Sequence, residues 1–118
     1  MNIIVWDSGI TQPEDKGILL KDVIESGEVD RKKSYCIDAN YGKGGNVKRY
    51  FERSSRQMVF DNNKYRMLTC EECEKLQTVT MGYTNHVSKF WRKHMLGNGW
   101  TVDVIKHIFK GINQGNIC

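Results

Sequence analysis

The chain has 118 residues, of which 39% are hydrophobic and 27% charged, with a single proline; this is the composition of one small globular domain and excludes a disordered chain. No apolar run approaches the ~20 residues that cross a bilayer and no signal-peptide pattern opens the chain, so we expect no membrane span and a cytoplasmic protein. The net charge of +4 is uneven, because residues 31–118 hold sixteen bases against seven acids, which favours either a phosphate-binding face or an unevenly charged solvated surface.

The first half of the chain is predicted to be mostly strands and loop. Strands are expected at 2–7, 34–38 and 56–60, a short helix at 17–27, a glycine-rich loop at 39–46 and a turn at 61–64. Gly27 is expected to end the short helix, since glycine is a frequent helix terminator.

The second half is predicted to be mostly helical. Thr69 and Glu72 have the spacing of a capping box, which opens a helix over 69–77. A second helix over 87–96 is expected to stop at Gly97, and a third is expected over 101–112 with Thr101 as its N-cap. The third helix carries an apolar stripe: Val102, Ile105, Ile108, Phe109 and Ile112. We therefore expect one α+β domain over 1–118, with strands and loop in 1–60 and three short helices in 61–118.

Two segments carry a family resemblance. Residues 66–77, RMLTCEECEKLQ, fit the pattern Arg-x-Leu-Thr-x-x-Glu-x-x-x-Leu-Gln, and residues 96–104, LGNGWTVDV, place Gly-Asn before the last helix. In this order and at this spacing they resemble the ninth and tenth motifs of DNA cytosine-5 methyltransferases. Upstream segments are similar to the target-recognition regions of phage and bacterial members. The chain thus resembles the carboxyl-terminal part of such an enzyme.

The parts of that family that perform catalysis have no counterpart here. Members attack cytosine with a cysteine thiolate from a Pro-Cys loop, assisted by a glutamate in a Glu-Asn-Val segment. The only proline is Pro13, which precedes Glu14, and no Glu-Asn-Val or cofactor-binding glycine turn occurs. Cys70 and Thr80 stand where the family usually has proline. The resemblance therefore implies no enzyme activity, no catalytic residue and no bound cofactor.

A basic segment is the candidate nucleic-acid site. Its cations are Lys43, Lys48, Arg49, Arg53 and Arg56. Tyr41, Tyr50 and Phe51 are interleaved with them, and Glu52 is the only acid. This pattern suits double-stranded DNA phosphates, and the family resemblance favours that interpretation; the alternative is a solvated basic hairpin.

Three other groups of residues have open assignments. Gly97 and Asn98 match a cofactor-edge position of the family, or else form a helix C-cap and turn. Trp91, Trp100 and Phe109 are candidates for a protein interface, with the rival that the last helix folds onto the chain's own strands. The four cysteines and three histidines match no common zinc framework, so we expect ordinary reduced thiols and no metal.

Three roles are compatible with these patterns. In the first, the chain is the recognition subunit of a split methyltransferase, completed by another chain that carries the catalytic motifs; its last helix is expected to bind a larger protein or a second copy of the chain. Alternatively, it is a phage or mobile-element counter-defence protein that inhibits a host restriction or CRISPR nuclease. The third alternative is a remnant without function.

Overall fold

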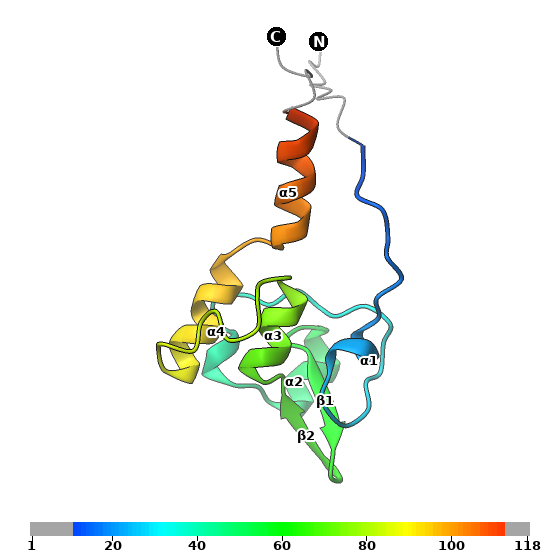
Figure 1. The fold of residues 1–118 in the computed structure, drawn as a ribbon. Coiled ribbons are helices and arrows are strands. Elements are labelled where there is room, and N and C mark those ends of the chain that lie inside the picture. Colours follow the sequence, from blue (N-terminus) through cyan, green and yellow to red (C-terminus); the bar gives the residue numbers. More distant parts are fainter. Residues whose placement is uncertain (1–10, 113–118) are drawn as a thin grey trace, which may run out of the picture.

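The computed structural model describes residues 11–112, so the strand predicted at 2–7 lies outside the described residues. Along the chain the elements are α1 (Leu20–Val23), the 3-10 turn η1 (Tyr41–Lys43), α2 (Val47–Arg53), β1 (Met58–Asp61), β2 (Lys64–Met67), α3 (Cys70–Leu76), α4 (Lys89–Asn98) and α5 (Val102–Gly111). A two-stranded antiparallel sheet is thus followed by helices (Figure 1), which confirms the predicted α+β class.

The hairpin β1–β2 is tight because its turn has the backbone that a two-residue connection needs. Asn62 and Asn63 both have positive φ, 51° and 61°, in the region that asparagine tolerates well. Phe60 is paired with Tyr65 across the strands, and Glu28 adds a single bridge to Phe60. The turn predicted at 61–64 is confirmed, although the first strand begins at Met58 rather than at residue 56.

Two predictions for the first half are wrong, for the same physical reason. The helix predicted over 17–27 is shortened to α1, because the backbone N–H of Glu25 donates to the distant Glu72 Oε2 at 2.7 Å. The segment 34–38 forms no strand and pairs with neither strand of the hairpin, and the N–H of Tyr35 donates to Gln57 Oε1 at 3.2 Å. In both segments a buried side chain replaces a backbone hydrogen-bond partner.

The core lies where α3, α4, η1 and β1 meet. Its buried residues are Ile37, Tyr41, Val59, Leu68, Cys73 and Leu96. The predicted stop of the second helix at Gly97 is wrong, since α4 continues to Asn98. Gly97 lies so close to the backbone of Asp38 and Ala39 that a Cβ there would collide with it. This glycine therefore lets α4 pack against the segment that precedes η1.

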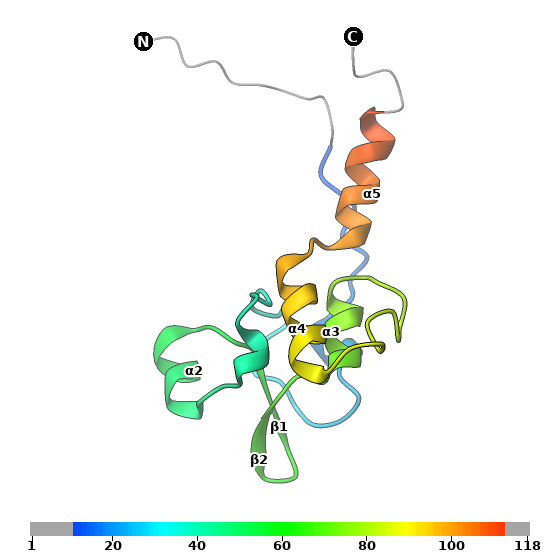
Figure 2. The ribbon, with the colours of Figure 1, turned by 90° about the vertical axis from the view of Figure 1, so that its left-hand side faces the viewer.

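Helix α5 projects away from this body (Figures 1 and 2), and none of its residues is buried. Gln77, just after α3, fixes its base: its side chain donates to the Leu96 carbonyl at 2.7 Å and accepts from Thr101 Oγ1 at 3.0 Å. Thr101 is the N-cap residue, as predicted. Within residues 11–112, no helix is long and apolar enough to span a membrane.

Candidate nucleic-acid interface

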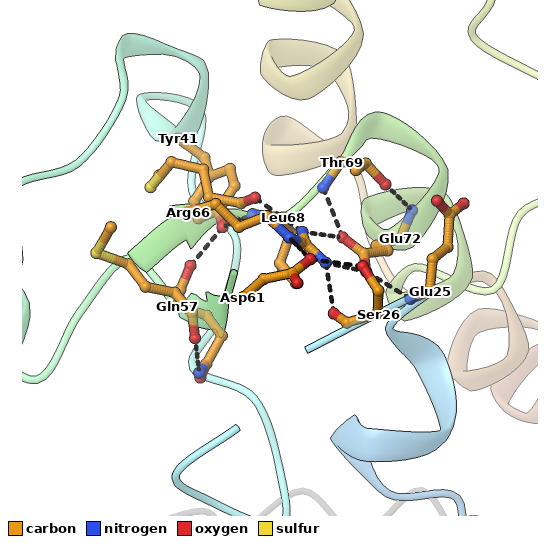
Figure 3. Close-up of polar contacts among 11 residues, drawn as sticks. Glu25, Ser26, Tyr41, Gln57, Asp61, Arg66, Leu68, Thr69 and Glu72 are labelled. Carbon is orange, nitrogen blue, oxygen red and sulfur yellow. Dashed lines mark hydrogen bonds and ion pairs between the residues drawn. The ribbon is translucent and has the colours of Figure 1, made fainter. Parts of the chain in front are cut away.

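Arg66 on β2 joins three separate segments of the chain (Figure 3). Its Nε donates to Asp61 Oδ2 at 3.2 Å, and its two terminal nitrogens donate to the two carboxylate oxygens of Glu72 at 2.8 and 3.1 Å. Nη2 also donates to the Ser26 carbonyl at 2.8 Å. A bidentate guanidinium–carboxylate pair has a fixed geometry, so the hairpin, α3 and the loop after α1 are held in one arrangement.

Glu72 is fully buried, and its carboxylate accepts four hydrogen bonds. Besides Arg66, the N–H groups of Thr69 and Glu25 donate to it at 2.8 and 2.7 Å. Burial alone would raise the pKa of Glu72, but the hydrogen bonds from Arg66, Thr69 and Glu25 outweigh it and lower that pKa. Thr69 Oγ1 in turn accepts from the N–H of Glu72 at 3.1 Å, which confirms the predicted capping box.

Tyr41 and Gln57 connect the glycine-rich loop to the hairpin. The buried Tyr41 hydroxyl donates to the Gln57 carbonyl and accepts from the N–H of Leu68 at 2.8 Å. Burial raises the pKa of Tyr41, so the hydroxyl stays neutral and keeps its donor proton. The fixed η1 turn leads directly into α2, which carries most of the predicted DNA contacts.

Helix α2 is positioned by Tyr50, which is buried beneath it. Gln57 Nε2 donates to the Tyr50 hydroxyl at 3.0 Å, and that hydroxyl donates to Asp30 Oδ1 at 2.7 Å. Asn46 caps the helix, since its side chain accepts from the N–H of Arg49 at 3.3 Å. With Tyr50 facing inward, the rest of α2 faces outward.

The structure brings together three of the five predicted phosphate-binding residues. Arg49, Arg53 and Arg56 line one small polar pocket of about 180 Å³. Asp38, Gly45, Asn46, Tyr50 and Ser55 complete its lining. Arg56 Nη1 donates to the Gly44 carbonyl at 3.1 Å, which orients its guanidinium. Lys43 and Lys48 are exposed and lie outside this pocket.

These cations are not neutralised by carboxylates of the described residues. Every ion pair among residues 11–112 involves other bases: Lys16, Arg31, Lys33, Arg66 and Arg92. Asp38 lines the same pocket as the three arginines but forms no ion pair with them. The surface over α2 therefore keeps its positive charge.

The three predicted interface residues are exposed but lie on three separate segments. Trp91 is on α4, where its ring contacts Phe90 and His94. Trp100 borders a groove of about 600 Å³ between residues 33–37, the end of α3 and the first turn of α5. Phe109 is two turns further along α5. Any single partner that contacts all three must extend along both helices.

Gly97 and Asn98 take part in helix packing and in a local hydrogen bond. Gly97 is in contact with the Asp38–Ala39 backbone. Asn98 Nδ2 donates to His94 Nε2 at 3.2 Å, and His94 Nδ1 donates to the Ala39 carbonyl at 3.1 Å. Both residues thus support the contact between α4 and the segment before η1.

The described thiols are of two kinds, while Cys118 lies outside the described residues. Cys36 is exposed, and Cys70 and Cys73 are buried in α3 without a disulfide. Burial raises the pKa of Cys73 to about 12, so this thiol stays protonated. Among residues 11–112, no group of three His, Cys, Asp or Glu side chains is arranged to hold a metal ion.

A second buried carboxylate, which no sequence pattern singles out, joins α3 to α4. Glu74 accepts from the N–H groups of Gly82 and Thr84, each at 2.8 Å, and pairs with Arg92 of α4 at 3.4 Å. Burial would raise the pKa of Glu74, and these hydrogen bonds with the charge of Arg92 lower it overall. Glu74 is one of three glutamates in α3, and the sequence alone does not show which of them are buried.

Comparison with known protein families agrees with the resemblance carried by residues 66–77 and 96–104. The model of the family described as C-5 cytosine-specific DNA methylase matches residues 4–114. The match includes the glycine-rich loop at 39–46, α2, the β1–β2 hairpin and the helices α3, α4 and α5.

Proposed function

Since the chain belongs to the C-5 cytosine-specific DNA methylase family, we propose that it is a DNA target-recognition module that depends on a second chain for catalysis. The observation that carries this proposal is the cluster of Arg49, Arg53 and Arg56 around one polar pocket. Their charges have no carboxylate partner among the described residues. An unpaired arginine cluster of this kind suits phosphate oxygens.

The geometry around the cluster supports binding without a large rearrangement. Tyr50 fixes α2 from below, and the Arg66–Glu72 pair fixes the hairpin behind it. The Arg56 guanidinium is also held by the Gly44 carbonyl, and a side chain held in this way loses less entropy on binding than a mobile one. We therefore assign the DNA backbone contacts to α2 and the residues that flank it.

The proposal of incomplete catalysis is supported by the sequence itself. The single proline, Pro13, is followed by Glu14, so no Pro-Cys pair is present. Cys70 and Cys73 are enclosed in α3, where a base cannot reach their sulfur atoms. The exposed Cys36 follows Tyr35 and not a proline. These observations support the proposal that the thiolate nucleophile for cytosine is supplied from outside this module.

Helix α5 supports the proposal that a partner exists. Its polar side faces the segment 11–18: Lys16 pairs with Asp103 at 3.5 Å, and His107 Nε2 donates to the Thr11 carbonyl at 2.7 Å. Ile108 and Phe109 lie on the opposite, apolar side and remain exposed. Burying such a side chain is worth ~1.5–3 kcal/mol, so this stripe favours a protein contact.

Salt dependence of DNA binding tests the first part of the proposal. We expect the affinity for a mixed-sequence duplex to fall with salt, with a log–log slope of about 0.9 per phosphate neutralised. Arg49→Ala with Arg53→Ala should reduce that slope by up to about two units. Lys106→Ala with Lys110→Ala on α5 is the matched control, since it removes the same charge far from α2. Equal slopes for both double variants would contradict the assignment.

Methyl transfer tests the second part. We expect the chain alone to transfer no radiolabelled methyl group to DNA, at the level of a boiled control. Added to a methyltransferase catalytic subunit that lacks its own recognition region, it should restore transfer, and Phe109→Ser should weaken that effect. Transfer by the isolated chain would refute the proposal, whereas failure of every such subunit to respond would refute the split-enzyme role.

A further inference from the structure

Three exposed aromatic rings form a continuous row across α2 and the hairpin. The ring centroid of Phe51 is 5.6 Å from that of Tyr65, and Tyr65 is 5.1 Å from Phe60. These side chains are 57%, 38% and 39% exposed. The ring planes meet at 88° and 58°, so the three rings form one contiguous apolar patch, and such patches on a protein surface often mark binding sites.

The fold holds the aromatic row (Phe51, Tyr65 and Phe60) rigidly. Phe60 and Tyr65 are directly opposite each other in the β1–β2 register, so both rings project from the same face of the hairpin. Phe51 follows the buried Tyr50 on α2, with the two rings 5.2 Å apart edge to face. Tyr50 is itself anchored by Gln57 and Asp30, so the row is preorganised.

The charges nearest the aromatic row are mixed, and most cations of the basic segment lie across α2 from it. Lys48 is one helical turn before Phe51 and lies on the same side of α2, whereas Arg49 and Arg53 lie on the other side, at the arginine pocket. Two exposed carboxylates are near the row, since Glu52 follows Phe51 and Glu28 bridges to Phe60. The other nearby acids are already occupied: Asp61 binds Arg66 and Ser26, and Asp30 binds Arg31 and Tyr50.

We infer that the aromatic row stacks unpaired nucleic-acid bases while Arg49 and Arg53, across the short helix α2, bind phosphates further along the same strand. Aromatic rings beside a cationic surface are the usual means of binding a single strand, because every base has a π face. In an intact duplex the faces of the bases are already stacked on their neighbours. The chain should therefore prefer DNA that contains unpaired bases, an inference that rests on the proposed DNA-binding function.

Three oligonucleotides test the inference, of which the single strand and the abasic strand carry equal charge. The probes are a labelled single strand of about 12 nucleotides, the same strand in a duplex, and an abasic strand with the same number of phosphates. In fluorescence anisotropy at one salt concentration, the single strand should bind at least ~5-fold more tightly than the abasic strand, the lower limit for stacking of one base. The full chain is used throughout.

Conservative variants separate stacking from charge. Phe51→Leu with Tyr65→Leu keeps the apolar contact between α2 and the hairpin but removes two rings. It should abolish the preference for the single strand over the abasic strand and leave the salt slope unchanged. Tyr83→Leu is the matched control, since Tyr83 is an exposed aromatic residue on the α3–α4 connection, and it should change neither quantity.

The outcomes separate this inference from the proposed function. Equal binding of single and abasic strands, with the duplex still bound in a salt-dependent way, overturns the stacking inference and leaves DNA recognition intact. An unchanged preference in the double leucine variant, confirmed as folded by circular dichroism, also overturns it. No binding to any of the three probes at low salt contradicts both.

Discussion

Replacing Glu72 by glutamine should unfold the module more readily than any surface substitution of the same size. The Glu72 carboxylate accepts two hydrogen bonds from Arg66 and one each from the N–H groups of Thr69 and Glu25. A glutamine has one acceptor oxygen, so its NH₂ group would face two of these donors. Removing one partner of a buried ion pair costs about 3–5 kcal/mol. In the variant Arg66 would still pair with Asp61, and its side chain is partly exposed. We therefore expect the free energy of unfolding to fall by ~3 kcal/mol, the lower end of that range.

The measurement is urea denaturation followed by tryptophan fluorescence and circular dichroism. Urea denaturation should show the loss of ~3 kcal/mol directly, and a thermal melt followed by circular dichroism should show a Tm lower by about 12 °C. Glu71→Gln is the matched control: Glu71 is the neighbouring residue, is partly exposed, and pairs with Arg92 at 3.2 Å, so it should lose under ~1 kcal/mol. A Glu72→Gln variant as stable as Glu71→Gln would refute the view that this pair holds the three segments together.

Two further predictions follow from the same contacts. The pKa values of Glu72 and Glu74 are lowered in the folded chain. Their contribution to stability is therefore present above the ordinary glutamate pKa of 4.5 and is lost as pH falls through the lower folded values. The free energy of unfolding, measured as a function of pH, should fall in this acid range, and Glu72→Gln should make the fall shallower. Gly97→Ala should destabilise the chain by ~1–3 kcal/mol or more, because its Cβ would collide with the Asp38–Ala39 backbone, despite alanine's higher helix propensity; Asn98→Ala should change it by under ~0.5 kcal/mol, and a stabilised Gly97→Ala would show that this contact is loose.

Features that depend on neighbouring residues could be predicted from the sequence. Thr101 is the N-cap residue of α5 as predicted, although its hydroxyl donates to Gln77 and makes no cap hydrogen bond. The Thr69–Glu72 capping box and the turn at 61–64 each involve positions at most three apart, and both are confirmed. The same holds for the amphipathic character of α5. Local hydrogen bonding and periodicity decide such features, so a single sequence contains the information.

Features that depend on distant residues could not be predicted in this way. Helix α1 is short because Glu72, 47 residues away, accepts the hydrogen bond of the Glu25 N–H. Gly97 was expected to end α4, whereas it lies inside that helix and adjoins Asp38. Neither effect leaves a local pattern, since an internal glycine and a terminating glycine look the same in sequence.

The candidate site combines both kinds of feature. The sequence shows that basic residues are clustered in 43–56, but it does not show which of them line the pocket. Positive φ at Ser54 and Arg56, 50° and 59°, turns the chain so that Arg56 joins Arg49 and Arg53 at one pocket. Lys43 and Lys48 are left outside it. Because Tyr50 is the buried residue of α2, it determines which way Lys48, Arg49 and Arg53 face on that helix.

The residues that most clearly indicate the family are also the least available for a ligand. Arg66, Thr69 and Glu72 direct their polar groups toward one another and toward the loop after α1, with Glu72 fully buried. They can influence DNA binding only by positioning α2 and the hairpin. Glu72→Gln should therefore weaken DNA binding only under conditions in which it also unfolds the chain, whereas Arg49→Ala with Arg53→Ala should weaken binding with the stability unchanged. Separation of the two effects in this direction would place recognition in α2, and structural support in the segment 66–77.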